Sequence, residues 1–85
     1  MVDTAQLRVE GEAPPARVRF AKRLRRLRVE KGFAHARTLA RALGIEENRY
    51  TRYERAEVEP NLTLINRICQ VLAISPNELL DDGAR

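Results

Sequence analysis

The feature that most constrains the fold of this chain is a pair of short apolar patterns separated by one glycine. In residues 36–43, ARTLARAL, three apolar side chains fall on one face of a helix: Leu39, Ala40 and Leu43. In residues 46–55, EENRYTRYER, two tyrosines three residues apart mark an inner face: Tyr50 and Tyr53. The sequence therefore predicts two short helices joined by a tight turn at Gly44-Ile45.

A third helix with a similar apolar period precedes this pair. Residues 16–31 place three apolar side chains at intervals of four and three residues and surround them with cations: Phe20, Leu24 and Leu27. This spacing predicts an amphipathic helix that ends at Gly32, because glycine readily takes the left-handed conformation of a helix terminus.

Two further helices are expected after the pair. Asn61 is a favourable N-cap residue for residues 62–72, whose apolar stripe comprises Leu62, Ile65, Ile68, Cys69 and Leu72. The stretch SPNE at 75–78 is a capping box with proline at the first helical position, and it opens a last helix over 76–80 that is expected to bury Leu79 and Leu80. No strand-like alternation occurs, so the sequence predicts an all-α fold, a compact bundle of five helices.

Residues 15–80 are predicted to form one domain between two terminal segments. Residues 1–14 have no helical period, and we interpret them as a flexible N-terminal arm, although the stretch AQLRVE could pair as a short strand in an oligomer. Residues 81–85 are a C-terminal tail. A chain of 85 residues is long enough for one small domain and no more.

The composition narrows the class of protein. One cysteine excludes an internal disulfide and cannot build a metal site, which favours a reducing, cytoplasmic location. No run of eighteen apolar residues or signal-peptide pattern is present, so we expect a soluble protein with no membrane partner. Residues 17–55 hold thirteen Lys or Arg against four Glu, a local charge of +9, whereas both ends of the chain are acidic. This distribution indicates one surface that faces a polyanion and another directed elsewhere.

The spacing of these elements resembles the phage repressor and Cro type of helix-turn-helix regulators. The resemblance covers about residues 18–80 and is carried by LRRLRVEKG, LARALGI, YTRYE, a proline and LINRICQVLAISPNELL. It implies a lambda-repressor-like DNA-binding domain, in which residues 46–55 form the recognition helix in the major groove and residues 36–43 cross the DNA backbone.

The resemblance also implies roles for individual residues. The outward positions of the recognition helix would read base edges: Glu47, Asn48, Thr51 and Arg52. A second set would lie near phosphates: Arg28, Ala36, Arg37, Arg49 and Arg55. Arg28 would in addition pair with Glu54 and so tie residues 16–31 to the recognition helix. The other cations of residues 16–31 are interpreted as a solvated face, and Tyr50 and Tyr53 as core residues rather than stacking platforms.

Several positions depart from the family pattern. The GFAHA turn is one residue longer than the common form, and His35 and Ala36 replace a frequent Ser-Gln pair. Ala56 stands where a glycine is usual, and Glu46 where a small polar N-cap is usual. A carboxylate at Glu46 has a simple structural account, because it favours the helix dipole. Glu47 has two open interpretations, the same dipole effect or acceptance of a hydrogen bond from cytosine N4.

No pattern in the chain indicates an enzyme. His35 has no second histidine near it, so we expect no metal and no cofactor, and Cys69 is interpreted as an inert buried thiol. Neither a nucleophile-base set nor a glycine-rich phosphate loop is present.

The sequence favours a DNA-binding transcriptional regulator, a repressor that occupies a palindromic operator as a homodimer. One recognition helix reads too few base pairs to select an operator in a genome, and the acidic end with Leu79 and Leu80 is the expected dimer surface. The alternative is an antitoxin-like or adaptor module that uses the same fold to bind a protein partner.

Overall fold

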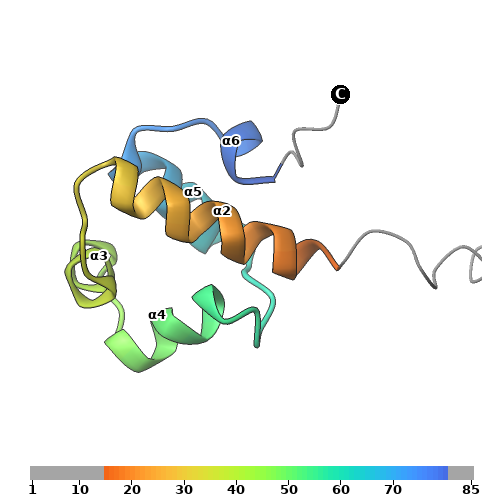
Figure 1. Cartoon of the computed structure of the whole chain (residues 1–85), viewed down its shortest axis with the longest axis horizontal. Helices are drawn as coiled ribbons and strands as arrows, with labels where there is room; N and C mark the ends of the chain where they lie inside the picture. Colours follow the sequence, from red (N-terminus) through yellow and green to blue (C-terminus); the bar gives the residue numbers. More distant parts are fainter. Residues whose placement is uncertain (1–14, 81–85) are drawn as a thin grey trace, which may run out of the picture.

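The computed structural model of this protein describes residues 15–80, and in that range the chain forms five helices and no strand. The helices are α2 (Ala16–Glu30), α3 (Ala36–Leu43), α4 (Glu47–Glu54), α5 (Leu62–Leu72) and α6 (Pro76–Leu80), shown in Figure 1. The predicted all-α fold is confirmed, and the predicted helix boundaries agree with the structure to within one residue. The predicted arm (1–14) and tail (81–85) lie outside the described residues.

The helices pack around α2, which contacts α4 and α6. In Figure 1, α4 lies on one side of α2 and α6 lies on the other. Helix α3 contacts both α4 and α5, so it joins the two halves of the bundle. The centre of the core consists of fully buried side chains from all five helices: Leu24, Leu39, Leu43, Tyr50, Ile68, Leu72 and Leu79.

Four of the helices end in the same way, by a Schellman turn. In each, the residue after the last helical turn has a positive φ, and its backbone N–H and that of the next residue bond back to the final carbonyls. The residues with positive φ are Gly32 (96°), Gly44 (79°), Ala56 (61°) and Ala73 (58°). Two of these turns therefore place alanine in a conformation that suits glycine better.

The starts of the later helices confirm two predicted caps. The Asn61 Oδ1 atom accepts the backbone N–H of Leu64 at 2.8 Å, as an N-cap does. The Glu78 carboxylate accepts the backbone N–H of Ser75 at 3.2 Å, which is the returning bond of a capping box. Helix α4 begins one residue later than predicted, so Glu46 is its N-cap residue, and its side chain makes no capping hydrogen bond.

Two predicted core positions are wrong. Leu62 is 81% exposed, and Leu64 is buried in its place, because Leu64 lies nearer than Leu62 to the face of α5 centred on Ile65, Ile68 and Leu72. Leu80 is 47% exposed, whereas Leu79 is buried. Consecutive residues point in different directions around a helix, so the short α6 can turn only one of the two leucines into the core.

The alanines at helix ends give a test of this backbone geometry. Ala73→Gly and Ala56→Gly should each raise the free energy of unfolding by about 0.5–1 kcal/mol, because relief of the left-handed strain exceeds the added entropy of the unfolded chain. Denaturant unfolding measures the change. Ala42→Gly, inside α3, is the matched control and should lower stability by about 1 kcal/mol. Lower stability in Ala73→Gly would contradict the proposed strain.

Candidate nucleic-acid interface

Helix α4 separates its residues into two faces. Tyr50, Tyr53 and Glu54 are buried against the rest of the domain. The side chains opposite to them, on the helical period, are Asn48, Arg52 and Arg55, and all three are exposed. Arg49 flanks this outer face and is also exposed, and Thr51 is half-buried. Glu47 lies seven residues before Glu54, on the same side of the helix, and is exposed because it is in the first turn. Of the side chains predicted to read bases, Asn48 and Arg52 lie on the outward side of α4, Thr51 lies at its edge, and Glu47 is exposed at the N-terminal end of the helix.

The Thr51 hydroxyl has a partner within its own helix. Its Oγ1 atom donates to the Asn48 carbonyl oxygen at 3.0 Å. This bond occupies the hydroxyl proton, so the Thr51 groups that remain for an outside partner are the methyl group and the lone pairs of Oγ1.

The inner face of α4 is attached to α2 by a buried ion pair. Arg28 Nε lies 2.7 Å from Glu54 Oε2, and Arg28 Nη2 lies 3.4 Å from Glu54 Oε1. The side chains are only 11% and 9% exposed. Arg28 Nη1 also donates to the Phe33 carbonyl at 2.9 Å, and the Tyr50 hydroxyl donates to Glu54 Oε2. The pair implied by the resemblance is thus present, and it connects α2, α4 and the turn that follows α2.

The environment of this pair shifts the pKa values of its members. Burial, together with the hydrogen bond to Glu54 and the charge of Glu54, raises the pKa of Tyr50 far above its usual value. Burial alone would lower the pKa of Arg28, but the hydrogen bond and the charge of Glu54 outweigh burial and raise it. Tyr50 therefore stays a hydroxyl donor, and Arg28 stays a cation, over the whole physiological range of pH.

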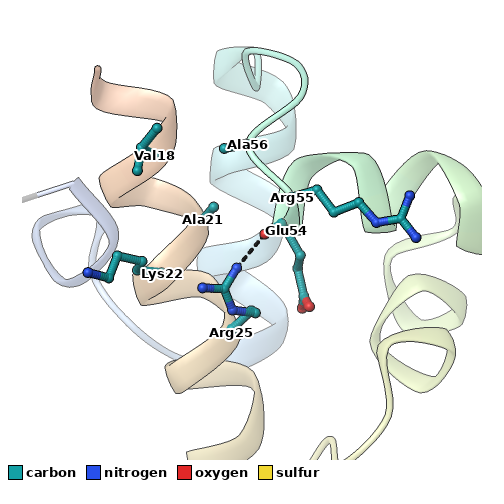
Figure 2. A pocket seen from close by; sticks show the side chains of 7 residues that line it. All are labelled: Val18, Ala21, Lys22, Arg25, Glu54, Arg55 and Ala56. Atoms are coloured by element: carbon teal, nitrogen blue, oxygen red, sulfur yellow. Dashed lines mark hydrogen bonds between the residues drawn. The ribbon is translucent and has the colours of Figure 1, made fainter. Parts of the chain in front are cut away.

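Two more arginines of α2 hold the C-terminal end of α4. Arg25 Nη1 donates to the Glu54 carbonyl oxygen (Figure 2), and Arg17 Nε donates to the Ala56 carbonyl oxygen at 3.0 Å. Carbonyls at a helix end carry partial negative charge, so cations stabilise them. The interpretation of Arg17 and Arg25 as part of a solvated face is wrong. Their spacing from Arg28 could have identified them, since Arg17, Arg25 and Arg28 share one side of α2.

An open hollow of about 300 Å³ lies between α2 and this end of α4 (Figure 2). Its lining comprises Val18, Ala21 and Ala56, the basic residues Lys22, Arg25 and Arg55, and Glu54. The three basic side chains place positive charge between α2 and the C-terminal end of α4.

The start of α3 carries two of the predicted phosphate contacts, Ala36 and Arg37. His35 is the N-cap residue, and its side chain makes no capping hydrogen bond. Both Ala36 and Arg37 are in the first turn of α3. Ala36 is half-buried, and Arg37 is exposed. An uncapped helix start next to an exposed arginine suits an anion.

Glu57 is a residue that the sequence did not identify. It follows α4, and its carboxylate lies 3.6 Å from Arg52 Nε and 3.8 Å from Arg55 Nη1. Arg52 and Arg55, assigned from the sequence to a base and to phosphate respectively, thus share one acidic neighbour. A signal for it exists in the sequence, because Glu57 is the first acid after the basic block of residues 17–55.

Residues 15–80 give little support for a metal site, a reactive thiol or a membrane span. No group of three or more His, Cys, Asp or Glu side chains is arranged to hold a metal ion in that range. Burial and the charge of Glu78 raise the pKa of the Cys69 thiol, which disfavours a reactive thiolate. None of the described helices has the length and apolar character needed to cross a membrane.

Comparison with known proteins agrees with this geometry. The family described as "Helix-turn-helix domain" matches residues 19–81. The chain is 34% identical over 61 residues to the SPbeta prophage-derived uncharacterized HTH-type transcriptional regulator YonR of Bacillus subtilis, a match that covers 72% of this chain and 56% of that protein. It is also similar to the crystal structure of the clp gene regulator ClgR from C. glutamicum, with a TM-score of 0.75 and 26% identity, over 86% of this chain and 92% of that chain.

The buried pair gives a stability prediction. Arg28→Ala should lower the free energy of unfolding by about 3 kcal/mol, because Glu54 is left buried without its charge partner. A cycle with Glu54→Ala should show a coupling of about 1–3 kcal/mol in denaturant unfolding. The control is Arg26→Ala, which breaks the exposed ion pair with Glu30 at 3.4 Å and should change stability by about 0.5 kcal/mol or less. Additive effects of the Arg28 and Glu54 substitutions would refute the coupling.

Proposed function

The chain belongs to the helix-turn-helix family of transcriptional regulators, as its resemblance to the phage repressor and Cro type implied, and we propose that it is a sequence-specific DNA-binding repressor. The observation that carries the proposal is the division of α4. Its inner face is fixed by a buried ion pair, while its outer face presents polar and basic side chains to solvent. An α-helix fits the major groove of B-DNA, so this outer face is suited to reading base edges.

The proposed base-reading set is Glu47, Asn48, Thr51 and Arg52, of which Asn48 and Arg52 lie on this face. Arg52 suits a bidentate contact to guanine, and Asn48 suits one to adenine. Glu47 is exposed at the N-terminal end of α4, where the helix dipole favours it and where it could also accept from cytosine N4. The Thr51 methyl group could contact a thymine methyl group.

The proposed phosphate contacts surround this set. Arg49 belongs to α4, Arg55 directly follows it, and Ala36 and Arg37 are the first two residues of α3. Arg28 has five N–H donors, of which three are used inside the domain, so a phosphate contact from Arg28 would use the remaining ones. Contacts of this type position the protein and add affinity without sequence preference.

We further propose that the protein acts in the cytoplasm as a homodimer on a palindromic operator, and represses by blocking the promoter. Two recognition helices read twice as much sequence, at half-sites about one helical turn apart. The exposed Leu80 borders a hollow of about 170 Å³ whose lining includes Phe20, Pro60 and Ile65. Because α6 lies on the opposite side of α2 from α4 (Figure 1), pairing there would leave α4 open to DNA.

Two substitutions separate base reading from phosphate binding. Arg52→Ala should cost about 1–3 kcal/mol on a selected site and relax the preference at one base position. Arg55→Ala should weaken binding to all duplexes and reduce the salt slope by about one. Salt titrations on selected and random duplexes measure both effects. Equal losses on all sites would refute the role of Arg52, and absence of wild-type binding to any duplex would favour the protein-interaction alternative.

Leu80→Arg tests the dimer surface. It should weaken self-association and operator binding together, with helical content unchanged, because Leu80 is half exposed and outside the core. Sedimentation at micromolar concentration gives the oligomeric state, and circular dichroism gives the helical content. Val29→Arg, at an exposed apolar position on α2, is the control and should leave self-association unchanged. A wild-type protein that stays monomeric on its palindromic site would rule out the dimer.

A further inference from the structure

Glu57 occupies a position that the other helices give to an apolar residue. In the Schellman turns that end α2, α3 and α5, the residue directly after the one with positive φ is Phe33, Ile45 or Ile74, and each packs against the core. In the turn that ends α4, this residue is Glu57, whose N–H donates to the Arg52 carbonyl at 2.9 Å. A Schellman turn usually brings these two side chains into apolar contact, and here an ion pair replaces that contact.

The geometry of the ion pair leaves the end of Arg52 open. The contact is between Glu57 Oε1 and Arg52 Nε, at 3.6 Å. The terminal Nη1 and Nη2 groups of Arg52 are the ones that form a parallel bidentate contact to guanine O6 and N7. A carboxylate at Nε can therefore orient the guanidinium and still leave its reading edge available.

The backbone of Glu57 has a defined place relative to α4. The Schellman bonds join Ala56 to Tyr53 and Glu57 to Arg52, and the Arg17 and Arg25 side chains bond the carbonyls of Ala56 and Glu54. These contacts fix the turn against α2, so the carboxylate stays beside the outer face of α4. Its other oxygen lies 3.8 Å from Arg55 Nη1.

We propose that Glu57 is a positioning residue for DNA sequence selection, which holds Arg52 for base reading and opposes the use of Arg52 as a simple phosphate ligand. The inference rests on the proposed function. On a matching site, Arg52 keeps its Nε pair while its terminal groups bind guanine. On non-matching DNA, binding depends on phosphates, so Arg52 must also leave Glu57 to add a contact, and the carboxylate repels the backbone.

The test compares two variants with the same change of net charge. Glu57→Gln removes the carboxylate beside Arg52 and Arg55. Glu59→Gln is the matched control, because Glu59 lies two residues along the same segment but pairs with Arg17, at 3.4 Å. The probes are a random-sequence duplex and a duplex that the wild-type protein selects from a random pool, at one salt concentration and over a salt series. Glu57 is about half exposed, so the fold should tolerate the change, and circular dichroism checks it.

We expect Glu57→Gln to raise affinity for random duplex about three- to tenfold and to steepen the salt slope by about one, as Arg52 becomes free for a phosphate in addition to the one that Arg55 contacts. Affinity for the selected duplex should stay level or fall. The ratio of selected-duplex affinity to random-duplex affinity should therefore drop at least about threefold. In an Arg52→Ala background the same substitution should leave that ratio unchanged within error.

Two results would overturn the positioning role while the proposed function stands. One is an equal effect of Glu57→Gln and Glu59→Gln on the affinity ratio. The other is a drop in the affinity ratio when Glu57→Gln is made in the Arg52→Ala background. Glu57 would then act on selectivity through a residue other than Arg52. Failure of the wild-type protein to bind either duplex would overturn the proposed function and this inference with it.

Discussion

The orientation of α4 depends on the buried contact between Arg28 and Glu54. The side chains of Arg28 and Glu54 are only 11% and 9% exposed, and two charges are costly to bury. Arg28 also donates to the Phe33 carbonyl, and Glu54 also accepts from the Tyr50 hydroxyl, so the pair has further hydrogen-bond partners. Such a pair adds little net stability compared with apolar packing, but it tolerates few alternative arrangements. We infer that its main effect is directional, since it sets which side of an eight-residue helix faces outward.

The far end of α4 is held by a different kind of contact. Arg17 and Arg25 bond backbone carbonyls, so their hold does not depend on which side chains α4 carries outward. The inner side of the helix is likewise occupied by Tyr50 and Tyr53, which belong to the core. Anchoring through backbone and buried groups leaves the outer residues free to vary in chemistry without loss of the fold. A reading surface on a rigid element meets the geometric demand of base recognition.

The sequence predicted the helices well because their signals are local. Apolar periods and caps located all five, and the Asn61 cap formed as expected. The errors concern contacts that depend on tertiary packing. Leu62 and Leu80 have the right hydrophobicity but lie at the margin of their helices, where neighbouring elements decide burial. Arg17 and Arg25 could not be distinguished from other surface cations, because their acceptors are carbonyls about 30 or more residues away in sequence. Base and phosphate contacts stay predictions.

The acidic residues near α4 lie at opposite ends of its dipole. Glu46 and Glu47 lie at the N-terminal end, where the helix dipole favours negative charge, and this effect alone accounts for Glu46. Glu57 lies just past the C-terminal end, where the dipole disfavours a carboxylate. Helix stability alone would select a neutral or basic residue at that position, and the three comparable turns carry apolar ones. Arg52 and Arg55 offset the unfavourable charge locally, but an apolar residue would remove the need for this compensation. The placement of Glu57 is therefore better explained by its effect on the two arginines than by any benefit to the fold.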